Sequence, residues 1–196
     1  MLKVVDKIEG IDILKMFKNT NAIMEGHFML TSGYHSKYYL QCAKLLQYPN
    51  ITDSIIKAGL KTIDKKVLDG IDTVISPAIG GILFGYMIAY NLNRRMIFTE
   101  RKNEKMELRR GFDLKESENV LIAEDVITTG GSVKEVIEIC KEKKANISAI
   151  ISLVDRSENV IFDYPYKSMI KFEIEKYKPE DCPLCKDGIE INYMGS

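Results

Sequence analysis

The residues with the clearest chemical character lie in residues 120–133, Val-Leu-Ile-Ala-Glu-Asp-Val-Ile-Thr-Thr-Gly-Gly-Ser-Val. Glu124 and Asp125 are adjacent carboxylates, and a run of hydroxyl side chains and glycines follows at residues 128–132. Backbone N–H groups of such a run at the start of a helix, together with hydroxyl donors, bind a phosphate without a lysine. Carboxylates only accept hydrogen bonds, so they suit the vicinal hydroxyls of a ribose. This stretch therefore predicts a site for a ribose 5-phosphate group.

The hydrophobic pattern predicts the local structure that positions these residues. Residues 120–123 form a short apolar run typical of a buried parallel strand, and apolar residues recur at helical spacing after Ser132. Two commoner phosphate loops are excluded, because the chain has no Gly-x-x-x-x-Gly-Lys-Ser/Thr and no Gly-x-Gly-x-x-Gly after a strand. The competing interpretation is an ordinary turn whose acids cap the helix. The coincidence of strand, paired acids, hydroxyls and double glycine disfavours it.

Length and composition limit the remaining possibilities. The chain has 196 residues, enough for one α/β domain with a single sizeable core. Its 28 basic and 28 acidic side chains cancel, so no global field attracts nucleic acid or an acidic membrane. No apolar stretch reaches the roughly 18–20 residues of a membrane span, and the N-terminus lacks the apolar region of a signal peptide. We therefore expect a cytoplasmic protein with local anion sites and neither nucleic-acid nor membrane partners.

Four cysteines are too few for a fold stapled by disulfides. Cys182 and Cys185 have the spacing of a zinc knuckle or a redox pair, but a four-ligand metal site needs two further ligands. The only histidines of the chain, His27 and His35, are far away in sequence. The cysteine pair is therefore interpreted as structural, and no metal site is predicted.

Elsewhere the chain alternates between predicted helices and strands. Helices are predicted to end near residues 19–21 and to span residues 49–66, and strands are predicted at residues 73–76, 95–99, 147–154 and 168–174. Residues 82–90 are nearly all apolar and predict a helix buried on most sides. The preceding loop, residues 77–81, holds two glycines at the helix start, so it is a second candidate anion site. A tight loop without a ligand is the alternative.

Two polar segments stand outside this alternation. Residues 26–41 predict a hairpin rich in Tyr, His and Ser, which either lines a pocket for a planar base or merely covers a sheet edge. Residues 100–111 hold five basic side chains and little apolar content, so we expect an exposed, mobile loop or ribbon. Its bases are candidates to close onto a departing diphosphate. Arg156 follows a predicted strand, at the edge where open α/β sheets bind ligands.

At residues 120–133 the chain resembles the phosphoribosyltransferases of the type I fold, which use 5-phosphoribosyl-1-diphosphate (PRPP). Their signature is an apolar strand, two acids, two further residues and Thr-Thr/Ala-Gly-x-Ser/Thr. Three other motifs narrow the resemblance to the orotate phosphoribosyltransferases. Residues 26–39 resemble that family's orotate-side hood, residues 101–105 its flexible catalytic loop, and residues 154–157 its base-side arginine segment. The tail Pro-Glu-Asp-Cys-Pro-Leu-Cys resembles one bacterial and archaeal branch.

This resemblance implies a Rossmann-like α/β fold, with a central, mainly parallel sheet flanked by helices and a small N-terminal hood containing a hairpin. It implies one domain over residues 1–196, with the hood formed by about residues 1–45 plus part of the C-terminal segment and the core by about residues 50–175. The implied reaction transfers the ribose 5-phosphate group from PRPP to orotate, giving orotidine 5′-monophosphate and diphosphate in de novo pyrimidine biosynthesis. Mg²⁺ bound mainly through PRPP and a homodimer with shared active sites are also implied.

The resemblance also assigns site residues. Lys102, Lys105 and Asp125 have catalytic roles, and Thr128 and Arg156 contact orotate, whose carboxylate suits a fixed guanidinium. The residues assigned to PRPP are Arg101, Lys102, Lys105, Glu124, Asp125, Val126, Ile127, Thr128, Thr129, Gly130, Gly131 and Ser132.

The chain departs from the family pattern in three places. Other branches carry a lysine where Thr31 stands, a Tyr-Lys pair where Ile79-Gly80 stands, and a histidine where Glu107 stands. The corresponding contacts to diphosphate must be absent or replaced, and Arg109 and Arg110 are candidates to replace them.

Two alternatives stay open at the level of sequence. A purine or other base phosphoribosyltransferase shares residues 120–133 but needs no arginine for a base carboxylate. A regulatory protein that only senses PRPP needs a basic nucleic-acid face or an added helix-turn-helix, and the neutral charge and single domain disfavour it.

Overall fold

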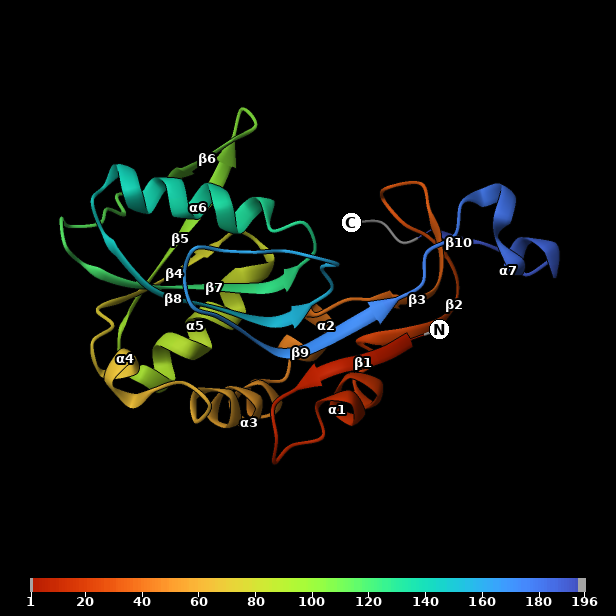
Figure 1. Cartoon of the computed structure of the whole chain (residues 1–196), viewed down its shortest axis with the longest axis horizontal. Coiled ribbons are helices and arrows are strands. Elements are labelled where there is room, and N and C mark those ends of the chain that lie inside the picture. Colours follow the sequence, from red (N-terminus) through yellow and green to blue (C-terminus); the bar gives the residue numbers. More distant parts are fainter. Residues whose placement is uncertain (1, 194–196) are drawn as a thin grey trace.

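The structure, a computed structural model, describes residues 2–193, and most of this part of the chain is built around one large twisted sheet (Figure 1). The inner strands β9, β8, β7, β4 and β5 run parallel, whereas the edge strands β1 and β6 pair antiparallel to their neighbours. The mainly parallel sheet predicted from the sequence is confirmed. In spatial order the strands are β1 (Leu2–Lys7), β9 (Tyr166–Ile174), β8 (Asn146–Asp155), β7 (Asn119–Ile127), β4 (Thr73–Pro77), β5 (Arg95–Lys102) and β6 (Lys105–Leu108).

Helices cover both faces of this sheet. α1 (Ile13–Asn19), α3 (Pro49–Leu60) and α5 (Gly80–Leu92) lie on one face, and α6 (Gly131–Glu142) lies on the other (Figure 1). Two short helices, α2 (Ala43–Leu46) and α4 (Lys65–Asp69), complete the first layer. Parallel strands that are covered on both faces consist of continuous apolar runs, which is why residues 120–123 have no exposed surface.

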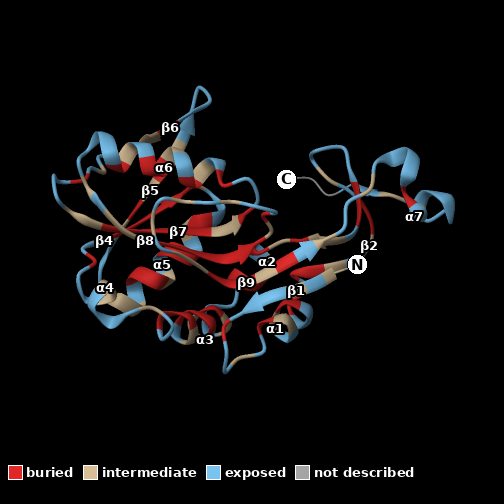
Figure 2. Cartoon of the chain, in the orientation of Figure 1, coloured by how far each residue is buried: buried red, intermediate tan, exposed pale blue. Residues whose placement is uncertain are grey.

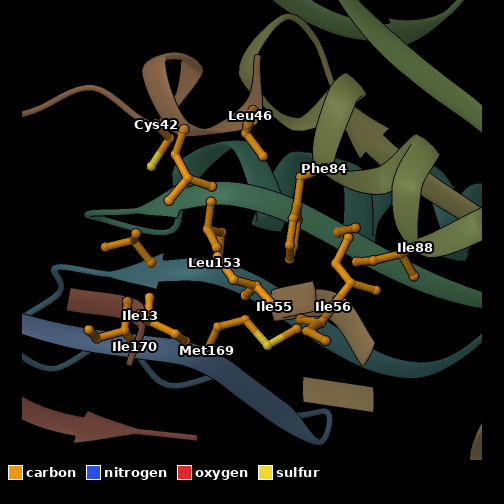
Figure 3. Packing of buried hydrophobic residues seen from close by; sticks show 14 of the residues in the cluster. Ile13, Cys42, Leu46, Ile55, Ile56, Phe84, Ile88, Leu153, Met169 and Ile170 are labelled. Atoms are coloured by element: carbon orange, nitrogen blue, oxygen red, sulfur yellow. The ribbon is translucent and has the colours of Figure 1, made fainter. Parts of the chain in front are cut away.

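The main core lies between the sheet and the layer of α1, α3 and α5. Phe84 and Ile88 from α5 pack with Ile55 and Ile56 from α3 and with Leu153 from β8 (Figure 3). All five side chains are fully buried, and burying one such side chain stabilises the fold by about 1.5–3 kcal/mol. Figure 2 shows the central strands buried, whereas the tip of the β5–β6 hairpin is exposed.

Strand β7 is longer than the sequence predicts. The apolar run ends at Ala123, but pairing with β8 continues through Glu124 opposite Ser152 and Ile127 opposite Asp155. Glu124 and Asp125 therefore lie on the carboxyl end of the strand and not in the turn. Helix α6 begins at Gly131, two residues earlier than the pattern indicates.

A second, smaller sheet lies beside the large one and contains the predicted hairpin. We call it the small sheet; it consists of β2 (Ile23–Met29), β3 (His35–Leu40) and β10 (Asn192–Tyr193). β10 comes from the C-terminal segment, as do the short helices η1 (Pro179–Asp181) and α7 (Pro183–Lys186) next to it (Figure 1). β1, in contrast, belongs to the large sheet, where it pairs with β9.

Other differences from the sequence prediction concern helices. The helix predicted over residues 49–66 ends at Leu60, and α4 starts separately after Asp64, whose carboxylate accepts a hydrogen bond from the Lys66 N–H. The prediction that residues 82–90 are buried on most sides is wrong for the single chain, because Tyr86 and Tyr90 are exposed. Within residues 2–193, no helix combines the length and the apolar character that crossing a membrane requires.

Candidate active site

The turn between β7 and α6 forms a pocket of about 60 Å³, lined by Glu124 and residues 126–133. Gly130 has a φ of 75°, and a Cβ there would lie 2.9 Å from Val160 Cγ2, so this position requires glycine. The N-cap residue Gly130 has no side chain to cap α6. The Gly131 N–H makes a long hydrogen bond of 3.4 Å to Thr129 Oγ1, and the following N–H groups of the first turn face the pocket. The pocket has the donors that the sequence predicts for a phosphate.

The second glycine loop lies directly beside the two carboxylates. A Cβ on Gly80 would clash with Asp125 Oδ1 and lie 2.7 Å from Oδ2, and a Cβ on Gly81 would lie 3.1 Å from Glu124 Oε1. The Ala78–Ile79 peptide before these glycines is cis. The N-terminus of α5, which also lacks a side-chain cap, thus meets the carboxyl end of β7. Sequence reasoning gave both loops but not their contact, because no local pattern encodes it.

Burial controls the electrostatics of the carboxylate pair. Glu124 is only 7% exposed, and burial first, then the neighbouring charge of Asp125, raises the pKa of Glu124 to about 9. Burial likewise raises the pKa of Asp125. The Asp125 N–H donates a hydrogen bond to Glu124 Oε1 at 3.2 Å. The free site therefore keeps a proton on this pair at neutral pH and favours ligands that donate hydrogen bonds or bring positive charge.

Arg156 lies next to this site, at the end of the neighbouring strand. Its backbone N–H donates to the Ile127 carbonyl oxygen at 2.8 Å, which places Arg156 and Thr128 after paired ends of β8 and β7. Its Nε is buried and has no hydrogen-bond partner among the described residues, and Ser157 Oγ beside it shares this property. Burial lowers the pKa of the guanidinium, and its side chain lines a cavity of about 410 Å³. An unpaired buried donor of this kind favours an anionic ligand.

The charged segment after β5 is a β-hairpin, one of the two forms that the sequence predicts. The turn residues Asn103 and Glu104 have φ values of 47° and 65°. At the tip, Lys102 pairs with Lys105 across the hairpin, and both are exposed. Two like charges placed opposite each other are unfavourable, and a bound anion relieves the repulsion. The tip projects beyond the body of the sheet (Figure 1).

The other bases of this segment are held differently. Arg101 donates to the Glu104 carbonyl oxygen at 2.6 Å and to Glu135 Oε1 on α6 at 2.7 Å. Arg110, a candidate to replace missing family contacts, instead donates two hydrogen bonds of 2.8 Å to the Glu100 carboxylate. Arg109 is exposed and makes no ion pair within the described residues. The structure thus brings together the two glycine loops, the acids and Arg156, but leaves the hairpin bases apart.

Comparisons with known proteins agree with this geometry. The phosphoribosyl transferase domain family matches residues 42–184. Orotate phosphoribosyltransferase of Caldicellulosiruptor bescii is 50% identical over 184 residues, which cover 93% of this chain and 95% of the relative. The enzyme of the same description from Thermotoga maritima is 45% identical over 185 residues, or 94% and 97% of the two chains. The chain belongs to the orotate phosphoribosyltransferase family.

Members of this family transfer the ribose 5-phosphate group from PRPP to orotate, and this chain does the same. A solved structure of orotate phosphoribosyltransferase from Aeropyrum pernix matches with a TM-score of 0.65 at 22% identity, covering 93% of this chain and 92% of that one. An adenine phosphoribosyltransferase from Thermoanaerobacter pseudethanolicus matches with a TM-score of 0.60 at 18% identity, covering 69% and 88%. At such identities these two matches show the fold, and the family assignment rests on the closer relatives. The two relatives at 45% and 50% identity favour orotate as the substrate over a purine base, and an enzyme over a protein that only senses PRPP.

Proposed function

We propose that this orotate phosphoribosyltransferase acts as a Mg²⁺-dependent homodimer in the cytoplasm, as one domain whose small sheet belongs to the hood. In each chain residues 124–132 hold PRPP, and Thr128 and Arg156 hold orotate. The observation that carries this assignment is the meeting of the β7–α6 pocket, the buried Glu124 with its neighbour Asp125, and the unpartnered Arg156 Nε at one sheet edge. The described cysteines are all unpaired thiols, which suits a reducing compartment.

In this proposal the β7–α6 pocket holds the 5′-phosphate, and Glu124 and Asp125 accept hydrogen bonds from the ribose hydroxyls. When diphosphate leaves C1, positive charge builds up on the ribose. That charge favours the ionised form of the buried pair, whose pKa burial otherwise raises. The attraction is therefore stronger in the transition state than in the ground state, which is what accelerates a reaction.

Arg156 supplies the discrimination between bases. The orotate carboxylate gives its buried guanidinium a charged acceptor, whereas adenine and hypoxanthine leave it unpaired. A site built around a buried polar group rejects ligands that cannot satisfy that group. Assays of the purified protein with PRPP, Mg²⁺ and each base test this directly. Orotate absorbance should fall, and turnover of adenine or hypoxanthine at a similar rate would contradict the assignment.

The residues present fit Mg²⁺ that arrives with PRPP. Glu124 and Asp125 offer oxygen ligands, which Mg²⁺ prefers, and they lie beside the start of α5, the second candidate anion site. Within residues 2–193, the single group of three or more potential metal ligands consists of histidines and cysteines, so no acidic cage of that size occurs there. When bound, Mg²⁺ neutralises charge on the departing diphosphate. The chain's own contribution is to hold the ribose and to aim its C1 at the base.

The exposed face of α5 supports the homodimer. Leu83, Tyr86 and Tyr90 follow one another at helical spacing and are 51%, 60% and 72% exposed. An apolar stripe of this kind typically marks a protein interface. We infer that a second copy covers it and that each β5–β6 hairpin reaches the neighbour's site, because the hairpin tip projects away from the β7–α6 turn of its own chain (Figure 1).

Mixing two inactive variants tests the shared site. If Lys105 acts on the partner's diphosphate and Asp125 on its own ribose, Lys105→Ala and Asp125→Asn homodimers should each be nearly inactive. A heterodimer would carry both lesions in one site and leave the other intact, so activity should return to about half the wild-type value. Differently tagged chains allow the heterodimer to be isolated and subunit exchange to be verified. An exchanged but inactive mixture would show that the hairpin acts within its own chain.

A further inference from the structure

Outside the active site, four metal-ligating side chains meet where the C-terminal segment crosses the small sheet. His27 lies on β2 and His35 begins β3. Cys182 directly precedes α7, and Cys185 belongs to that helix. One ligand atom from each of the four lies within 4.8 Å of all the others. The first three are buried and Cys185 is exposed. The fold thus supplies the two ligands that the cysteine pair lacks in the sequence.

Four of the six distances among these ligand atoms match the edges of a tetrahedron around a metal ion. His27 Nε2 lies 3.0 Å from His35 Nδ1, 3.5 Å from Cys182 Sγ and 3.7 Å from Cys185 Sγ. Cys185 Sγ lies 3.3 Å from His35 Nδ1. Zinc bonds of about 2.0 Å to nitrogen and about 2.3 Å to sulfur give tetrahedral edges of about 3.3 Å between nitrogens and about 3.5 Å between nitrogen and sulfur. Each observed distance agrees within a few tenths of an ångström.

The ring nitrogen of His27 that faces away from the cluster makes the hydrogen bond that is usual for a metal-ligating histidine. His27 Nδ1 lies 2.7 Å from the Ile189 carbonyl oxygen. A carbonyl only accepts, so Nδ1 carries the proton and Nε2 presents its lone pair to the cluster. A backbone carbonyl that fixes the tautomer in this way is the common outer partner of a ligating histidine. Asn192 Nδ2 also donates to the His27 carbonyl oxygen at 3.3 Å, which anchors the C-terminal segment on β2.

We propose that His27, His35, Cys182 and Cys185 bind one Zn²⁺ ion with a structural role. Two imidazoles and two thiolates are a common ligand set of structural zinc sites, and these soft ligands favour Zn²⁺ over Mg²⁺. Four protein ligands fill a tetrahedral site, so no position stays open for a substrate. The site is therefore distinct from the Mg²⁺ that accompanies PRPP.

The part of the chain that this ion would hold consists of very short elements. α7 has four residues and β10 has two, and a helix this short is not stable by itself. The ion joins Cys185 to His27, which are 158 positions apart in sequence, and so ties the C-terminal segment to both strands of the hairpin. The same strand β3 carries Tyr39, one of the residues that interact electrostatically with Arg156. Loss of zinc should therefore weaken the binding of orotate more than the binding of PRPP.

Metal analysis of the purified full-length protein tests the proposal. We expect one zinc per chain, and a Cys182→Ser, Cys185→Ser double variant should lose it. A Cys140→Ala variant, which changes a buried cysteine outside the cluster, should keep it. Removing a ligand should weaken zinc binding by more than the about 10–100-fold cost of removing an outer partner. Retention of zinc by the double variant would place the ion elsewhere and overturn the proposal.

Wild-type protein supplies a second test if the double variant does not fold. Replacing zinc by Co²⁺ should give the intense visible bands of a tetrahedral ion together with thiolate-to-cobalt charge transfer. Removing zinc with a chelator should lower Tm by more than about 5 °C, and restoring zinc should reverse the change. Metal-free protein with two titratable thiols would instead show a hydrogen-bonded cluster, and a Cys182–Cys185 disulfide would show a redox pair. Either result would refute zinc binding.

Discussion

Replacing Glu124 by glutamine should stabilise the ligand-free protein at alkaline pH while it removes activity. Glu124 is 7% exposed, and burial, followed by the adjacent Asp125 charge, raises the pKa of Glu124 to about 9. Glutamine has nearly the same shape, still accepts a hydrogen bond from the Asp125 N–H, and carries no charge at any pH. The variant therefore separates the requirement for a carboxylate from the requirement for a side chain of this size.

The magnitude follows from the two pKa values. Below pH 4.5, the ordinary value for Glu, the carboxyl is protonated in both states, and its contribution to stability is fully present. As pH rises toward 9, the unfolded chain ionises but the folded chain does not, so stability falls by about 1.4 kcal/mol per pH unit. Between about pH 6 and about pH 8 the wild type should therefore lose about 3 kcal/mol relative to Glu124→Gln. Titrating groups that do not interact with Glu124 are common to both proteins and cancel in the difference, whereas Asp125, whose charge acts on Glu124, contributes to it.

Urea unfolding without PRPP and Mg²⁺, followed by circular dichroism at several pH values, measures this difference. The slopes with urea should agree between proteins, so that the midpoints report stability. Glu142→Gln, which removes an exposed carboxylate on α6, is the matched control and should follow the wild type. Turnover of Glu124→Gln should fall by on the order of 10²-fold or more, because a neutral amide does not stabilise charge on the ribose.

Parallel pH profiles for the wild type and Glu124→Gln would refute this reasoning. They would mean that Glu124 is ionised in the folded protein at neutral pH and that a partner compensates its burial. Unchanged turnover in a folded Glu124→Gln protein would separately remove the carboxylate from the proposed mechanism.

Two further predictions concern single side chains. Arg156→Ala should raise KM for orotate by about 10-fold to about 150-fold, since a charge-assisted hydrogen bond contributes about 1.5–3 kcal/mol, and should change KM for PRPP little; equal changes would indicate a structural role. Gly80→Ala should lower kcat by about 100-fold with little loss of stability, because the added methyl group displaces the Asp125 carboxylate. Gly70→Ala is the control, since a Cβ there lies 3.4 Å from its nearest neighbour, and unchanged kcat in Gly80→Ala would show that the carboxylate position is not critical.

The sequence determined the parts of this protein that depend on neighbours in the chain. The buried strand, the two acids and the glycine turn lie within fourteen consecutive residues, so the sequence alone predicted a ribose 5-phosphate site there. The apolar runs predicted the individual strands and helices for the same reason, whereas the mainly parallel sheet was implied by the family resemblance. The charge of residues 100–111 indicated an exposed, mobile loop or ribbon, since the segment has little apolar surface to bury, and the structure shows the ribbon.

Only the tertiary structure decided which distant residues meet. The extension of β7 past Ala123 depends on pairing with β8, and the close approach of Gly80 to Asp125 depends on how α5 packs against β7. The exposed stripe on α5 depends on which face the sheet covers, which an all-apolar helix does not reveal. The two histidines and two cysteines are separated by about 150 positions and meet because the C-terminal segment crosses the hairpin. Local pattern carries no information about such contacts, because their free energy arises only when the chain has closed the long loops between them.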